Sequence, residues 1–199
     1  YQSEWTNTPV LHIFPHWNWK EGQMVDVWAY SNAEEVELFL NGKSLGTKRK
    51  QGDDLHLMWR VAWEPGTVKA IARTGGKEVL TKEIHTAGKP ARILLEPDRT
   101  RLKADGKDLS FVKVSILDAE GNVVPFADNL VKFQVIGEGK LRATDNGNPI
   151  SMESFQAAER KAFHGLCLAV VQASSKAGKI TLKAVSDGLP EASVAIATE

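Results

Sequence analysis

The sequence has few of the features that mark several common classes of protein. It holds a single cysteine, Cys167, so no disulfide can form within the chain. No apolar run approaches the roughly 18 residues of a membrane-spanning helix. Basic and acidic side chains both number 25, so the formal charge is zero and there is no basic footprint for nucleic acid. We therefore expect no disulfide framework, no membrane insertion and no nucleic-acid partner.

Motifs for catalysis are also missing. No serine sits in a nucleophile-elbow context, and no glycine-rich phosphate loop leads from a strand into a helix. Hydrolysis of a glycoside needs two positioned carboxylates. Glu34, Glu35 and Glu37 cluster, but Glu35 and Glu37 alternate along one predicted strand and would share its solvent face. We expect no catalytic residue and no cofactor in this chain.

Candidate metal ligands do not form a convincing set. His12 and His16 are four residues apart in an extended segment, where that spacing does not build the zinc-binding face of a helix. Residues 118–122 and 145–148 are oxygen-rich loops of a kind that suits calcium. The same residue types also make ordinary turns, which is the interpretation we favour. The prediction is therefore no metal site.

Alternation of apolar and polar residues with a period of two predicts strands along most of the chain. In residues 25–30 and 35–40 every second side chain is aliphatic, and Asn41-Gly42 then predicts a two-residue hairpin turn. Cys167 lies in the apolar run 165–171 and is expected to be an inert core residue. Residues 154–161 are expected to hold one helical turn. The fold class predicted is all-β, with two tandem immunoglobulin-like antiparallel β-sandwich domains.

A change of composition marks the boundary between the two domains. All six tryptophans lie at or before Trp63, and the short segment Thr86–Pro90 contains both glycine and proline. We predict domains over residues 1–88 and 89–199. Residues 1–5 are neither a start methionine nor a signal peptide, so we expect a piece of a longer protein.

The segment Pro15–Trp19 gathers unusual side chains in a few positions. Two indoles and an imidazole follow Pro15, which favours an extended backbone before it and no helix. Such a group suits a sugar face or the seam between two domains. The alternative is that the tryptophans fill one end of a sandwich. The candidate substrate-rim or interface residues are His16, Trp17, Asn18 and Trp19.

Several motifs resemble the region that follows the catalytic barrel in glycoside hydrolase family 2 enzymes of the β-galactosidase type. In the first domain they are LHIFPHWNWKEG (11–22), VWAYSN (27–32), VELFLNGKSLG (36–46), WRVAWEPG (59–66) and KAIA (69–72). The opening YQSEW (1–5) is similar to the end of the last barrel helix. Residues 104–125 and 144–149 resemble the bacterial immunoglobulin-like domain, of the invasin and intimin type, at the C-terminus of the same enzymes.

The resemblance implies that the two catalytic glutamates lie upstream of Tyr1, so this chain has no catalytic residue. Its partner would be the parent enzyme's own catalytic barrel, and residues 15–19 would link barrel to sandwich near the active-site rim. A carbohydrate contact through Trp17 or Trp19 is then expected. We expect a periplasmic or secreted bacterial protein.

Two other functions fit the sequence. An independent carbohydrate-binding module would expose its aromatic side chains on a fixed platform, and an adhesin-type spacer would use the tandem sandwiches as a stalk. Solvent exposure of Trp17, Trp19 and Trp59 distinguishes these alternatives. A spacer has no need of a tryptophan cluster, so the tryptophan-rich first half argues against the adhesin-type stalk.

Overall fold

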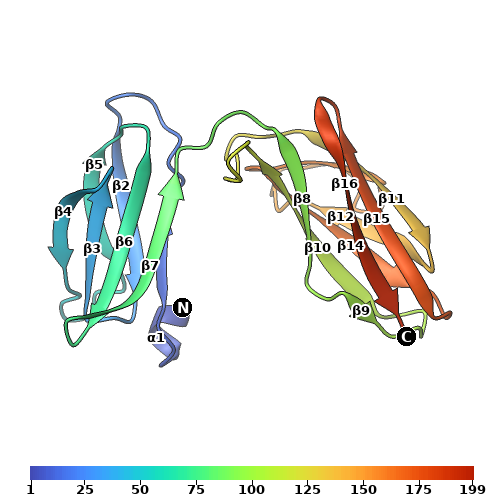
Figure 1. Ribbon diagram of the computed structural model, residues 1–199, viewed down its shortest axis with the longest axis horizontal. Helices are drawn as coiled ribbons and strands as arrows, with labels where there is room; N and C mark the ends of the chain where they lie inside the picture. The colour runs from blue at the N-terminus through green and yellow to red at the C-terminus, as the bar shows by residue number, and fades with distance from the viewer. The chain divides into compact units, whose positions relative to one another are not determined.

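The strands of the computed structural model, which describes residues Tyr1–Glu199, fall into two units (Figure 1). The first unit covers Tyr1–Thr86 and the second covers Ala87–Glu199. Apart from the short helix α1 (Gln2–Trp5), every regular element is a strand. The predicted all-β fold class is confirmed.

Seven strands build the first unit. They are β1 (Leu11–Phe14), β2 (Met24–Ser31), β3 (Glu35–Leu40), β4 (Lys43–Lys48), β5 (Leu57–Ala62), β6 (Thr67–Thr74) and β7 (Lys77–His85). One antiparallel sheet has the order β1-β2-β5, and the other has the order β4-β3-β6-β7. Two sheets of short strands with one buried side each form an immunoglobulin-like sandwich.

Strand alternation decides which side chains of the first unit are buried. In β2 and β5 every second residue faces inward, and Leu57, Trp59 and Val61 of β5 all lie in the core. Each fully buried aliphatic side chain contributes about 1.5–3 kcal/mol through removal from water. The period-two pattern in the sequence therefore predicted this core correctly.

The tip of the first hairpin is formed by Asn41 and Gly42, as predicted. Their φ angles of 50° and 81° lie in the left-handed region that a two-residue turn of this kind requires. The Asn41 Oδ1 accepts a hydrogen bond from the Thr67 backbone N–H at 2.9 Å, and its Nδ2 donates to the Pro65 carbonyl at 3.1 Å. Asn41 thus also fixes the neighbouring loop before β6.

Nine strands build the second unit. They are β8 (Arg92–Pro97), β9 (Arg101–Leu102), β10 (Leu109–Leu117), β11 (Leu130–Gly137), β12 (Gly139–Asp145), β13 (Glu159–Lys161), β14 (Leu166–Ala173), β15 (Gly178–Ser186) and β16 (Leu189–Thr198). The sheets have the orders β12-β14-β10-β8 and β13-β11-β15-β16-β9. All pairings are antiparallel except that of β9 with β16.

Two expectations for the second unit have different outcomes. Cys167 of β14 is a free, buried thiol in the aliphatic core, as expected. The helical turn expected in residues 154–161 is wrong. The chain instead makes a reverse turn, in which the Ala157 N–H donates to the Ser154 carbonyl, and residues 159–161 form β13, which pairs with β11.

The division between the units falls inside the segment Thr86–Pro90. The first unit ends at Thr86, two residues before residue 88, where the first domain was predicted to end. The reason is that Ala87 is buried in the core of the second unit and the Gly88 N–H donates to the Asp118 carboxylate at 2.8 Å. No helix in the structure is long and apolar enough to cross a membrane.

Candidate functional site

The segment Pro15–Trp19 connects β1 to the approach to β2 and has no regular secondary structure. Its four candidate residues differ in burial. Trp17 is buried, with 1% of its surface exposed, whereas His16, Asn18 and Trp19 are half-buried. The segment therefore has one side in the core of the first unit and one side at its surface.

Trp17 anchors the segment to the sandwich. Its indole N–H donates to the Glu64 carbonyl at 2.9 Å. Its own carbonyl accepts hydrogen bonds from the Trp63 indole at 3.1 Å and from the Thr86 hydroxyl at 2.9 Å. An indole held in this way cannot stack on a sugar without leaving the core, so the expectation that Trp17 contacts substrate is not supported by its position.

His16, Asn18 and Trp19 make a compact local structure at the surface. The Trp19 indole N–H donates to the His16 carbonyl at 2.7 Å, and the two rings stack with centroids 4.6 Å apart. The Asn18 backbone N–H donates to the His16 Nδ1 at 3.2 Å. This nitrogen therefore acts as an acceptor and carries no proton. These three residues, and not Trp17, are the part of the segment that can meet another surface.

Trp59 is also buried and does not form an exposed platform. Its indole N–H donates to the Gly46 carbonyl at 3.3 Å, and the Lys48 ammonium lies 5.4 Å from its ring centroid. The burial of both Trp17 and Trp59 speaks against an independent carbohydrate-binding module built on these indoles. Trp63 is half-buried and packs against the same core.

The clustered carboxylates of the first unit are engaged in local structure. Glu35 pairs with Arg49 at 2.7 Å, and Glu37 pairs with Arg73 at 2.9 Å. Hydrogen bonds from the Ser44 hydroxyl and then from Arg73 lower the pKa of Glu37, against the opposing effect of partial burial. A general acid needs a raised pKa, so the shift at Glu37 has the wrong sign for that role.

The two oxygen-rich loops have the geometry of turns. The Asp118 carboxylate accepts from the backbone N–H groups of Gly88 and Asn122 and from the Asn122 side chain, at 2.7–3.0 Å. Asp145 Oδ1 accepts from the backbone N–H groups of the next two residues. Protein donors thus already use these oxygens, and no group of three or more His, Cys, Asp or Glu side chains is placed to hold a metal ion.

A second cluster, not among the candidate residues predicted from the sequence, lies on the outward side of sheet β1-β2-β5. We call it the outer aromatic face, and its members are His12, Phe14, Trp28, Tyr30, His56 and Met58. Strand register places Phe14 opposite Trp28 and Trp28 opposite Met58, with His12 opposite Tyr30. The Trp28 and His56 rings stack with centroids 4.1 Å apart and planes 7° apart. Phe14 and Tyr30 stack at 5.6 Å and 10°.

A signal for this face is present in the sequence. In β1 and in the second half of β2 the outward residues are His12, Phe14, Trp28 and Tyr30, where a half-solvated strand would normally carry polar side chains. The alternation distinguishes the inward side from the outward side, and the aromatic character of the outward side is the signal for this cluster.

Comparison with protein families agrees with the two-unit structure. The model described as "Glycoside hydrolase family 2 C-terminal domain 5" matches residues 93–195, which is more than half of the chain. The chain belongs to glycoside hydrolase family 2. Residues 22–80 of this family 2 chain match a second model, described as a domain of unknown function (DUF4982). The first match lies in the second unit and the second match in the first unit. The chain therefore corresponds to the C-terminal region of a family 2 enzyme.

Several relatives of this family 2 chain are much longer than the chain itself. "Beta-galactosidase BoGH2A" of Bacteroides ovatus is 60% identical over 200 residues, which cover 100% of the chain and 24% of that protein. A "Beta-glucuronidase" of Formosa agariphila is 29% identical over 96% of the chain and 20% of its own length. The crystal structure of a beta-glycosidase from Bacteroides vulgatus matches with a TM-score of 0.93 and 34% identity, over 98% of the chain and 26% of that protein. The chain thus spans about a quarter or less of each of these three proteins.

Proposed function

We propose that this chain is the non-catalytic C-terminal region of a β-galactosidase-like glycoside hydrolase and packs on the enzyme's catalytic barrel. The observation that carries the proposal is the 60% identity to the Bacteroides ovatus β-galactosidase along the whole chain, which covers 24% of that protein. The catalytic carboxylates belong to the remaining part of the parent. The periplasm or the outside of a bacterial cell is the location we propose for it.

The lack of a catalytic centre in the chain supports a structural role. Glycoside hydrolysis requires one carboxyl group as acid and a second as nucleophile or base, facing one another across the substrate. Glu35 and Glu37 instead pair with arginines on the strand surface. The isolated chain therefore has no hydrolase activity in this proposal.

The names of the relatives support a role that does not depend on the sugar. The same region occurs in a protein named as a β-galactosidase and in one named as a β-glucuronidase. A region shared by enzymes with different sugar specificities is suited to holding the barrel and its pocket edge in place. We assign that edge to His16, Asn18 and Trp19, with Trp17 as their buried anchor.

A comparison of three proteins tests the proposal. The full-length enzyme, the enzyme truncated before Tyr1, and the isolated chain are assayed on an aryl β-galactoside, and the thermal inactivation of the first two is followed. We expect no turnover by the isolated chain and faster inactivation of the truncated enzyme. Turnover by the isolated chain that disappears on mutation of one of its own carboxylates would refute the proposal, as would a truncated enzyme as active and stable as the full-length one.

A further inference from the structure

The outer aromatic face is a contiguous, mainly aromatic surface on a sheet whose other side already forms a core. Phe14, Trp28 and Met58 form one row across the three strands, and His12, Tyr30 and His56 form the next row. Contiguous apolar surfaces of this kind on a folded domain usually mark an interaction site.

The face has a polar boundary. The next outward row across β2 and β5 pairs Asp26 with Arg60, and both side chains are exposed. An apolar centre with charged residues at its rim is the anatomy of a protein–protein interface.

The orientation of the rings separates a protein partner from a sugar. Stacking on a pyranose requires an open ring face. Here one face of Trp28 lies against His56, and one face of Phe14 lies against Tyr30. Rings stacked along a sheet direct their edges outward, and ring edges with the flexible Met58 thioether suit a packed protein surface.

The chain leading into β1 is fixed beside this face. The Asn32 side chain, just after β2, donates to the Thr6 and Thr8 carbonyls at 2.9 and 2.8 Å and accepts from the Val10 N–H at 2.8 Å. Glu4 of α1 also pairs with Lys50 at 2.7 Å. Any preceding polypeptide is therefore delivered to the edge of the sheet at which the outer aromatic face begins, at His12.

The length of the Bacteroides ovatus relative favours one occupant, the rest of the parent protein. The matched region makes up 24% of the Bacteroides ovatus protein, so about three quarters of that protein lies outside it. Resting on the proposed function, we infer that the outer aromatic face docks against the catalytic barrel of the parent enzyme. The parent's own barrel is the partner that the fixed leading segment holds at high local concentration.

The three methionines of the chain provide a test that needs no mutation. Met58 lies on the outer aromatic face and is 40% exposed in this structure, whereas Met152 lies in a loop of the second unit and is 97% exposed. The oxidation of methionine depends on access to its sulfur. In the full-length enzyme treated with dilute hydrogen peroxide and analysed by peptide mass spectrometry, we expect Met58 to oxidise more slowly than Met152 by about tenfold or more. A ratio near twofold, as the two exposed fractions alone would give, would overturn the inference.

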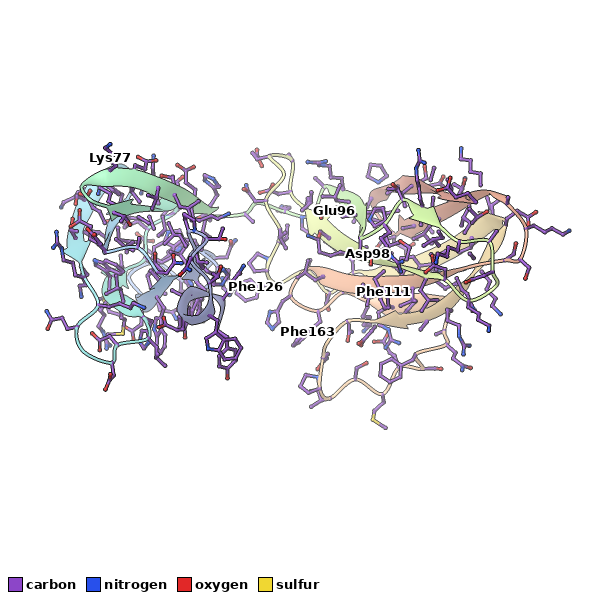
Figure 2. All side chains as sticks on the ribbon, turned by 90° about the horizontal axis from the view of Figure 1, so that it is seen from below. Lys77, Glu96, Asp98, Phe111, Phe126 and Phe163 are labelled. Atoms are coloured by element: carbon purple, nitrogen blue, oxygen red, sulfur yellow. The ribbon has the colours of Figure 1, made fainter.

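Paired substitutions sharpen the test. In the full-length enzyme, Met58→Glu places a charge on the face, and the matched control Phe111→Glu places one on the outward side of β10, where Phe111 is 43% exposed (Figure 2). We expect Met58→Glu to hasten thermal inactivation and to raise the peroxide reactivity of Met24, the exposed methionine at the start of β2. We expect Phe111→Glu to change neither.

The outcomes separate this inference from the proposed function. If truncation before Tyr1 leaves the enzyme unchanged, the proposed function fails. If truncation destabilises the enzyme but Met58 reacts freely and Met58→Glu behaves like Phe111→Glu, the barrel packs elsewhere and only the inference fails. Protection of Met58 that depends on adding a galactoside oligosaccharide would identify a sugar as the occupant and also overturn it.

Discussion

The two units have similar sandwich folds, but different kinds of side chain fill their cores and fix their loops. The first holds all six tryptophans, and indole N–H groups of Trp17, Trp59 and Trp63 tie its loops to backbone carbonyls. The second has an aliphatic core and fixes its loops with buried charged side chains, Arg160 and Asp118, each 1% exposed. An indole supplies apolar surface and one donor together, whereas a buried charge stabilises only when every polar atom finds a partner.

This difference allows the two units to be observed separately. Tryptophan fluorescence reports only on the first unit, because every tryptophan lies there, while circular dichroism reports on the strands of both. The following predictions test the contrast in order of decreasing effect.

Trp17→Ala should have the largest effect on the first unit. It removes a buried indole and leaves the Glu64 carbonyl without its donor, and core truncations of this size cost about 3–5 kcal/mol in the free energy of unfolding. Chemical denaturation followed by fluorescence measures the loss. The control Trp5→Ala removes an exposed indole and should stay within about 0.5 kcal/mol of wild type. Equal effects of the two substitutions would show that Trp17 is not a core anchor.

Arg160→Met should produce a comparable loss in the second unit. The Arg160 guanidinium donates to the Thr144 and Ser154 carbonyls at 2.8 Å and lies 3.6 Å from the Glu153 carboxylate. Arg160→Met leaves these two carbonyls without their donor, and each buried polar group left unsatisfied costs about 1–3 kcal/mol.

The same experiment has a matched control in Arg142→Met, because Arg142 lies on β12 but is exposed. We expect the circular dichroism transition of the second unit to move in Arg160→Met only, with the fluorescence transition unchanged in both variants. A shift of the fluorescence transition in Arg160→Met would contradict the assignment of this network to the second unit alone.

Asp118 should make the second unit sensitive to acid. Burial alone would raise the pKa of this carboxyl, but hydrogen bonds from Gly88, Asn122 and Gly121 outweigh it, so the pKa in the folded protein is lowered. Stability from Asp118 is therefore present above its unfolded pKa of about 3.9 and is lost as the pH falls toward the folded value. Asp118→Asn should flatten this acid dependence in circular dichroism while the fluorescence transition keeps its own. An unchanged acid limb in the variant would exclude Asp118 as its source.

The smallest expected effect is at Cys167. Burial raises the pKa of its thiol to about 12, with a smaller opposing contribution from Arg160. The reactive thiolate is then rare at pH 8, and the sulfur is also covered. We expect no labelling of the native chain by a thiol reagent over minutes and full labelling after denaturation. Rapid native labelling would show that β14 opens readily.

Much of the fold was determined by local sequence pattern. Period-two alternation in residues 25–30 and 35–40 and the Asn41-Gly42 turn depend only on neighbouring residues, so they predicted the strands and the first hairpin directly. The shift in composition placed the boundary within the segment where the two units divide. The helical turn predicted for residues 154–161 was wrong, because the pairing of β13 with β11 is a long-range contact that the local pattern does not contain.

The sequence by itself determined the strand pattern and the two sandwiches. Only the tertiary structure decided that Trp17 is an anchor, that His16 and Trp19 stack on one another, and that Phe14, Trp28 and His56 assemble into one outward surface. The physical reason is strand register. Alternation tells on which side of its own strand a residue lies, but only the pairing of β1 with β2 and of β2 with β5 decides which side chains from distant positions come into contact.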